Sequence, residues 1–349
     1  MVPPLMQTSL SDPSTQTADY IRSLQEGNGG IPWFKDGILD PWDHIEAAMG
    51  LASCGYINNA LRAYDFLSKI QSDSGGWYAS YQAGNPKDDT RMESNFVAYA
   101  ATGVWHLYLV TRDNAIIDRF WPMISKAINF VVGLQGPLGE IYWAVDSVKG
   151  LQKDALVTGC SSIYHSLGCA IAMAEVKGID CKHWIKVQAD LKHAILNEPE
   201  AFDRTWASKA RFSMDWFYPV LTGVLTGAEA KARIDQRWDE FVVDQLGCRC
   251  VSDEPWVTVA ESCELVMALM NIHDEVRARE IFNWIQQLRD KQGAYWTGYV
   301  YRDQAIWPEE QTSWTAGAVL LASDAIEQRS GGHRLFKEVV TGSTSGVVI

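Results

Sequence analysis

Two kinds of helical segment alternate along this chain of 349 residues. One kind is apolar on every face and rich in small residues, and its few charged groups lie in its first turn. A helix of this kind needs cover on all sides, whereas an amphipathic helix can face water on one side. The apolar segments begin near Asp43, Glu93, Cys160, Asp215, Glu261 and Glu310. The other kind is charged and amphipathic. These segments lie at about residues 57–72, 115–134, 180–195, 227–246 and 274–290. A first helix at about 14–26, or a C-terminal segment, completes the set.

The apolar segments recur about every 50 residues, which is typical of helical pairs stacked as a solenoid or closed into a ring. Turns that combine glycine with an aromatic residue separate the units, at 30–33, 75–78, 139–143 and 293–296. An apolar ring of helices inside an amphipathic ring gives both kinds the surroundings they need. We therefore predict an all-α fold, a single-domain (α/α)6 toroid over residues 14–340, with an irregular segment at 1–13 and a tail at 341–349. An open helical rod is the alternative, and the polar capping repeats it would need are not visible.

Composition argues against several classes of function. The net charge is −13 and no Lys/Arg cluster is visible, which argues against a nucleic-acid partner and against electrostatic docking on anionic lipid. Seven scattered cysteines fit a reducing compartment, and Cys248 and Cys250 lack a second half at zinc spacing, so we predict no metal and no cofactor. Neither a signal peptide nor a membrane-spanning run is recognisable. We expect a cytoplasmic protein; a peripheral hydrophobic contact with a membrane and the oligomeric state stay open.

Polar groups gather at the predicted N-terminal ends of the apolar helices, which would all open at one end of a ring of parallel helices. Any one of these groups could cap a helix or belong to a satisfied core pair, but six sets converging on one cavity would form a site. Carboxyl groups at the mouth of a buried helix are costly to desolvate, so a tuned acid or base is expected there. The groups are Asp40, Asp43, His44, Glu46, Glu93, Asn95, Ser161, Tyr164, Asp215, Glu261, Glu264, Glu309 and Glu310.

Aromatic residues accompany these acids along the chain. A single tryptophan is usually a core residue, and we expect that of about half of them. The others could wall an apolar cavity whose ring faces stabilise cations. The aromatic residues expected at this end are Trp42, Tyr99, Trp143, Tyr164, Trp216, Tyr218, Trp256, Trp296, Trp307 and Trp314.

The glycine–aromatic turns and the acid-led starts of the apolar helices resemble those of the squalene cyclase and prenyltransferase-like α/α toroids. The resemblance covers nearly the whole chain and is strongest in LDPWDHIEAAMGL, ESNFVAYAATGVWH, RFSMDWFYPVL, WVTVAESCELVMAL and WPEEQTSWTAGAVLLA. These segments look similar to single-domain class II terpene and meroterpenoid cyclases of the merosterolic acid synthase type. The resemblance implies an enzyme of secondary metabolism that protonates a long prenyl or prenylated aromatic substrate and closes rings on it in an apolar pocket.

The resemblance also implies a proton donor. In class II members it is an Asp of a D-x-D-D-T motif, and this chain has no complete copy of it: Asp88-Asp89-Thr90 matches the last three positions. We expect the donor to be Asp89 or Glu93, oriented by Asn95, with Asp215 as the second choice. We expect substrate contacts from Trp42, Tyr99, Trp143, Tyr164, Trp216, Tyr218, Trp256, Glu261, Trp296, Glu310 and Trp314.

Other functions stay open at this point. Glycoside hydrolases and polysaccharide lyases also use α/α toroids, with tryptophan platforms for sugars and a pair of carboxylates. A toroid that only binds a lipid is a second alternative. The cavity wall distinguishes these functions, because a prenyl pocket is closed and apolar with an acid at one end, whereas a sugar cleft is open and lined with charged and amide groups. The inner segments carry Ala, Met, Leu, Val and Cys rather than Arg or Lys, so the sequence favours a closed prenyl pocket over a sugar cleft.

Overall fold

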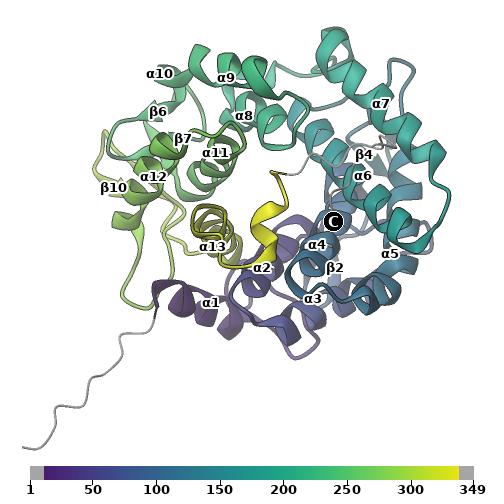
Figure 1. The fold of residues 1–349 in the computed structure, drawn as a ribbon, viewed down its shortest axis with the longest axis horizontal. Helices are drawn as coiled ribbons and strands as arrows, with labels where there is room; N and C mark the ends of the chain where they lie inside the picture. The colour runs from purple at the N-terminus through teal and green to yellow at the C-terminus, as the bar shows by residue number, and fades with distance from the viewer. Residues whose placement is uncertain (1–11, 338–349) are drawn as a thin grey trace, which may run out of the picture.

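The computed structural model describes residues 12–337 and shows two concentric rings of helices (Figure 1). Each inner helix packs against the next one along the chain, and the last packs against the first, which closes the ring. The inner helices are α2 (Pro41–Ser53), α4 (Ser94–Thr111), α6 (Val157–Lys177), α8 (Ser213–Leu221), α11 (Val259–Asn271) and α13 (Ser313–Glu327). The predicted single-domain (α/α)6 toroid is confirmed.

The outer ring is formed by helices that each pack against an inner helix. They are α1 (Pro13–Leu24), α3 (Ile57–Ile70), α5 (Asn114–Val132), α7 (Lys182–Asn197), α9 (Gly227–Gln236) and α12 (Glu275–Trp284). Shorter pieces lie in the connections: α10 (Trp238–Phe241), η1 (Pro199–Ala201), η2 (Lys209–Arg211) and η3 (Ile285–Leu288).

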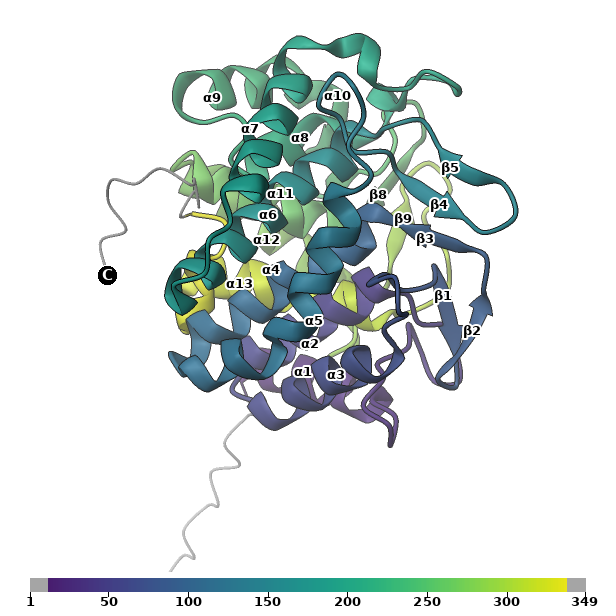
Figure 2. The ribbon, with the colours of Figure 1, turned by 90° about the vertical axis from the view of Figure 1, so that its right-hand side faces the viewer.

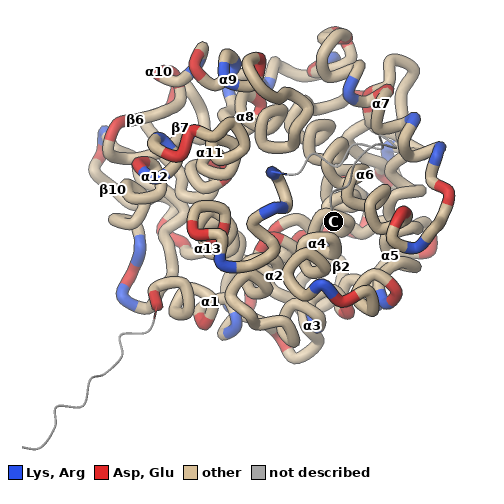
Figure 3. The backbone as a smooth tube through the Cα atoms, viewed as in Figure 1, with Lys and Arg blue, Asp and Glu red and all other residues tan. Residues whose placement is uncertain are grey.

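Burial follows the alternation seen in the sequence. In α11 every residue from 259 to 270 is buried, whereas the outer helix α12 buries only Ala278 and Ile281. Most charged residues accordingly lie on the outer helices and the connections (Figure 3). The inner helices are therefore covered on all sides, as their apolar composition requires.

Short antiparallel strands gather at one end of the rings (Figure 2). β1 (Ser80–Gln82) pairs with β2 (Asn85–Asp88), and β3 (Arg91–Glu93), β4 (Ala144–Asp146) and β5 (Gly150–Gln152) form a second sheet. A third sheet has the order β10–β9–β8–β7–β6, formed by β6 (Val242–Val243), β7 (Gly247–Arg249), β8 (Trp256–Thr258), β9 (Gly298–Val300) and β10 (Ala305–Ile306). Because β3 leads directly into α4 and β8 directly into α11, the strands form a rim around the N-terminal ends of the inner helices.

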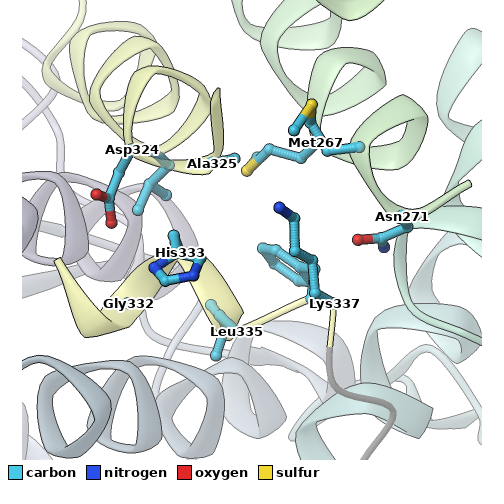
Figure 4. Close-up of a pocket in the computed structure, with 11 residues that line it drawn as sticks. Met267, Asn271, Asp324, Ala325, Gly332, His333, Leu335 and Lys337 are labelled. Carbon is cyan, nitrogen blue, oxygen red and sulfur yellow. The ribbon is translucent and has the colours of Figure 1, made fainter. Parts of the chain in front are cut away.

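The opposite end of the inner ring is closed by η4 (Gly331–Arg334) and the residues that follow it (Figures 1 and 4). His165 Nε2 donates a hydrogen bond to the Leu335 carbonyl oxygen at 2.9 Å, and the Phe336 ring lies 4.8 Å from the His165 ring. A void of about 20 Å³ remains between this segment and the ends of α11 and α13. The described residues therefore leave the strand-bearing end as the open one.

The predicted terminal segments lie almost entirely outside the described residues, which begin at 12 and end at 337. Within that range α1 begins at Pro13, close to the predicted start of the first helix. A search of the same range finds no helix with the length and apolarity that crossing a membrane requires.

Candidate active site

The N-terminal ends of the six inner helices converge on one cavity of about 210 Å³. Each helix contributes its second residue to the cavity wall, because the helices run parallel and start at the same level. These residues are Trp42, Asn95, Thr158, Met214, Ala260 and Trp314. The convergence expected from the sequence therefore exists, at the end of the ring that carries the strands.

Four carboxyl groups line this cavity, two from α2 and two from α11. Asp43 and Glu46 are three residues apart, as are Glu261 and Glu264, and this spacing places each pair on one face of its helix, one turn apart. Asp43 and Glu261, nearer the helix starts, form the upper level. Glu46 and Glu264 form the lower level, and they also line a void of about 10 Å³ deeper in the ring.

Both carboxyl groups of the lower level are buried and each accepts a hydrogen bond from a tyrosine. Tyr99 on α4 donates to Glu46 Oε2 at 3.0 Å, and Tyr218 on α8 donates to Glu264 Oε1. Burial raises the pKa of Glu46 to about 7. Burial, followed by repulsion from Glu46, raises the pKa of Glu264 well above its usual value. At neutral pH this level therefore holds at least one proton.

Asp43 is placed by the cap of its own helix. Asp40 Oδ1 accepts the backbone N–H of Asp43 at 3.0 Å, and Asp40 Oδ2 accepts the indole N–H of Trp33 at 2.7 Å. Burial raises the pKa of Asp43 well above its usual value, and the charges of Asp40, Glu46 and Glu264 add to the effect. These surroundings therefore favour the protonated form of Asp43 over its carboxylate.

Glu261 differs from the other three carboxyl groups in its hydrogen bonding. It lies in the first turn of α11 and is 9% exposed. Within residues 12–337 its Oε2 atom has no hydrogen-bond partner. The upper level thus combines Asp43, whose raised pKa favours the protonated form, with a carboxyl group that has one buried oxygen without a hydrogen-bond partner among the described residues.

Three aromatic side chains also line the cavity, those of Trp42, Phe96 and Trp314. Trp42 stacks on Tyr99, with ring centroids 4.2 Å apart and planes 6° from parallel, and its ring also lies 6.3 Å from that of Phe96. The indole nitrogen of Trp314 has no partner among the described residues. Flat apolar faces beside carboxyl groups suit a ligand that is apolar on one side and hydroxylated on the other.

The predicted proton donors near residue 90 lie outside this cavity. Asp88 Oδ1 accepts hydrogen bonds from the backbone N–H and the hydroxyl of Thr90, so the Asp-Asp-Thr sequence forms a turn between two strands. Asp89 is exposed in that turn. Glu93 forms an ion pair with Arg91 at 2.9 Å. Neither carboxyl group is among the residues that line the cavity.

The other predicted site residues are divided between the cavity and the surrounding structure. Asn95, Trp42, Glu261 and Trp314 line the cavity, and Tyr99 and Tyr218 line the void below it. Asp215 is buried but lines neither space; burial raises its pKa, and the charge of Arg233 on the outer helix α9 opposes that rise. The residues that line neither space are Trp143, Tyr164, Trp216, Trp256, Trp296 and Glu310.

Two of these residues face the outer layer rather than the hollow. Trp216 donates its indole N–H to the Arg233 carbonyl at 2.8 Å and stacks on Phe241 at 5.0 Å. The amino group of Lys192, on α7, lies 5.7 Å from the centroid of the Tyr164 ring. From the sequence we expected Asp43, Glu46 and Glu264 at the ring mouth and assigned them no role. The signal available in the sequence was the i, i+3 spacing of Asp43 with Glu46 and of Glu261 with Glu264.

Comparison with known proteins gives a strong match in sequence. The chain is 47% identical over 324 residues to the MMP endo-(1,4)-3-O-methyl-α-D-mannosidase of Mycolicibacterium hassiacum, which covers 93% of this chain and 89% of that protein. It is 26% identical over 168 residues to an uncharacterized glycosyl hydrolase of Methanocaldococcus jannaschii, covering 47% of this chain and 25% of that protein. No family model matches the chain.

Solved structures with the same fold act on sugars. A wild-type glycosidase superposes with a TM-score of 0.72 at 14% identity, over 90% of this chain and 96% of the other. A D-mannose isomerase superposes with a TM-score of 0.70 at 13% identity, over 94% of this chain and 100% of the other. At these identities the likeness shows the α/α toroid fold alone.

The interpretation as a class II terpene or meroterpenoid cyclase is wrong. The 47% identity is to an endo-mannosidase, and the related folds belong to a glycosidase and a mannose isomerase rather than to squalene cyclase-like enzymes. The expected prenyl or prenylated aromatic substrate and the role in secondary metabolism are withdrawn with it. The cavity agrees with this correction, because four carboxyl groups line it where a prenyl pocket would be apolar with an acid at one end. The findings favour the glycoside hydrolase alternative.

Proposed function

The chain belongs to the family of the MMP endo-(1,4)-3-O-methyl-α-D-mannosidase, and on this premise we propose that it is a glycoside hydrolase that cleaves internal (1,4) linkages between 3-O-methyl-α-D-mannose units. The observation that carries the proposal is the 47% identity to that enzyme along 93% of this chain. The cavity supports it, because four carboxyl groups from α2 and α11 line it together with aromatic rings from α2, α4 and α13.

Glycoside hydrolysis requires two carboxyl groups with different protonation. One donates a proton to the glycosidic oxygen as the bond from that oxygen to the anomeric carbon breaks. The other, ionised, either removes a proton from the attacking water or attacks the anomeric carbon itself. In both cases one water molecule is added across the linkage.

We assign the proton donor to Asp43. Burial and the neighbouring carboxyl groups raise its pKa and so favour the protonated form, and it lines the cavity, where a glycosidic oxygen can reach it. We assign the second role to Glu261, which lines the same cavity and whose buried Oε2 has no hydrogen-bond partner among residues 12–337. The positive charge that develops on the sugar ring would lie among these carboxyl groups and against the faces of Trp42 and Tyr99.

The lower level has two supporting roles in this proposal. Glu46 and Glu264 extend into the floor of the cavity, where they and their tyrosine partners can hydrogen-bond sugar hydroxyls. Their charges also repel the ionised form of Asp43, and so they help to keep the donor protonated.

The test is hydrolysis of a (1,4)-linked 3-O-methyl-α-D-mannose oligosaccharide, followed by the appearance of new reducing ends. Asp43→Asn and Glu261→Gln should each lower kcat by about a thousandfold, the scale expected for loss of a general acid or base. Both replacements keep the side-chain shape, so circular dichroism should be unchanged. Asp89→Asn is the matched control, because Asp89 is exposed outside the cavity, and it should retain full activity.

Two outcomes would contradict the proposal at different levels. If the unmodified protein leaves the oligosaccharide intact, the proposed function fails. If it cleaves the oligosaccharide and Asp43→Asn is as active as the unmodified protein, the function stands and the assignment of the donor is wrong.

A further inference from the structure

Two tryptophan pairs lie on the rim at opposite sides of the cavity, Trp143 with Trp206 and Trp256 with Trp307. We propose that they are sugar-stacking subsites that hold a linear (1,4)-linked glycan across the mouth, with the linkage to be cut above the carboxyl groups. This inference rests on the proposed function and adds to it the path of the substrate and the residues that bind its outer units.

The first pair is fixed beside the start of α4. The carbonyl oxygen of Trp143 accepts the backbone N–H of Ser94, the first residue of α4, at 2.8 Å. The Trp143 and Trp206 rings are 5.7 Å apart and 70° from parallel. The indole N–H of Trp206 donates to Asp203 Oδ1 at 2.8 Å, which fixes the orientation of this ring.

The second pair is fixed beside the start of α11. Trp256 is the first residue of β8, and Thr258, the last, is the N-cap of α11. The indole N–H of Trp256 donates to the Trp307 carbonyl at 2.8 Å, and the two rings are 4.9 Å apart and 74° from parallel. The Trp307 backbone N–H donates to the Gly298 carbonyl at 3.1 Å.

The order of helices in the inner ring places the two pairs opposite each other. Neighbours around the ring are α2, α4, α6, α8, α11 and α13, and α13 returns to α2. From α4 to α11 there are three steps in either direction around a ring of six. The cavity with Asp43 and Glu261 therefore lies between the pairs, and a chain that contacts both must pass over it.

None of these four rings is fully buried: Trp143, Trp206 and Trp256 are half-buried and Trp307 is exposed. Trp77 is fully buried, whereas Trp307 is 55% exposed although its backbone and its partner ring are held by hydrogen bonds. An exposed aromatic ring with a fixed orientation is already ordered, so a ligand that stacks on it pays little conformational entropy. Pyranose rings present C–H faces that stack on indoles, and a 3-O-methyl group adds apolar surface to such a unit.

An enzyme that cuts inside a chain must hold sugar units on both sides of the cleaved linkage. One aromatic pair would suffice for an enzyme that removes terminal units, whereas two pairs on opposite sides fit an internal cut. Because the contacts lie away from the reacting bond, they should affect binding of long substrates rather than the chemical step.

The experiment compares Trp307→Ala and Trp206→Ala with the unmodified protein on two substrates. One is the shortest (1,4)-linked 3-O-methyl-α-D-mannose oligosaccharide that the unmodified protein cleaves, and the other is a long oligosaccharide. Each variant should lower kcat/KM on the long substrate by about tenfold through KM, with less than about twofold effect on the short one. Trp307→Phe should keep most of the activity, and Val276→Ala, an exposed side chain on α12, should have no effect.

The inference is overturned if the variants lose the same factor on both substrates, or lose nothing on the long one. A binding measurement distinguishes failure of this inference from failure of the proposed function. If the unmodified protein cleaves neither substrate, the function fails, and calorimetric titration of the long oligosaccharide still tests the subsites. Trp307→Ala and Trp206→Ala should each weaken that binding by about tenfold, and equal affinity would reject the subsites.

Discussion

The protonation of Asp43 depends on residues from two helices that are far apart in the chain. Burial raises its pKa first, and the charges of Asp40, Glu46 and Glu264 raise it further. Three of these four carboxyl groups lie on or just before α2, and Glu264 lies on α11. The chemistry assigned to the cavity is therefore a property of the group of acids rather than of Asp43 alone.

Activity should accordingly fall on the alkaline side, as the pH rises through the raised pKa of Asp43 and the donor loses its proton. Glu46→Gln removes one charge that repels the Asp43 carboxylate, so the pKa of Asp43 should fall and the alkaline limb should move to lower pH. The measurement is kcat/KM against pH for both proteins. An alkaline limb at the same pH in both would show that Glu46 does not tune the donor.

Glu46→Gln should also change the pH dependence of stability. The folded-state pKa of Glu46 is about 7, above the ordinary 4.5, so the folded state holds a proton that the unfolded state releases. The contribution of Glu46 to stability is therefore full below pH 4.5 and is lost as the pH rises to about 7. At about pH 8 the variant should be more stable than the unmodified protein by on the order of 3 kcal/mol, and at about pH 4 the difference should disappear. Urea denaturation at the two pH values measures this, and Asp89→Asn is the control without effect.

At the scale of helices, the approach of α13 to α2 positions the lower level of acids. A Cβ atom on Gly317 would lie 2.8 Å from the Glu46 carbonyl oxygen, and one on Gly50 would lie 2.9 Å from the Cα of Gly317. The two backbones touch because neither glycine carries a side chain. Any added atom at this contact must displace the helix that carries Asp43 and Glu46.

Gly317→Ala should therefore lower the free energy of unfolding by about 1–3 kcal/mol, the range expected for overpacking a close contact. It should also lower activity, because α2 carries the proposed donor. Gly27→Ala is the matched control, since a Cβ atom there meets nothing within 4 Å and the backbone is not left-handed, and it should be close to neutral. Thermal and urea unfolding of the two variants measure the difference, and equal stability would show that the α2–α13 contact can relax.

At the scale of the whole molecule, the first helix joins the last repeat. Thr17 on α1 donates its hydroxyl to the Gly293 carbonyl at 2.8 Å, and Tyr20 donates to the Gln311 carbonyl at 2.6 Å. The buried apolar residues form one cluster that includes all six helical pairs. A closed ring differs in this respect from an open repeat array, whose terminal units can unfold on their own.

Closure predicts one cooperative unfolding transition despite the length of the chain. Urea curves followed by tryptophan fluorescence and by far-ultraviolet circular dichroism should coincide, because the tryptophans are spread around the ring. Two separated transitions would show that some helical pairs unfold independently.

The alternation of apolar and amphipathic helices was readable from the sequence, since burial on all sides leaves a local pattern. The apolar segment expected near Glu261 begins at Val259, and that expected near Glu93 begins at Ser94. The glycine–aromatic turns and acid-led helix starts that resembled terpene cyclases are found here in a toroid of the endo-mannosidase family. They indicate the fold rather than the reaction. The Asp-Asp-Thr sequence was misleading for a similar reason, because Asp88 stabilises a turn.

Local composition and helix direction were therefore enough to predict the double ring and the end at which polar groups gather. The folded ring decided which acids share a cavity, since Asp43 and Glu261 come together through ring closure and not through spacing in the chain. It also decided which acid keeps its proton, because that depends on burial and on charges brought in by another helix. The opposite placement of the two tryptophan pairs has the same origin, in the strands that ring closure brings to the rim.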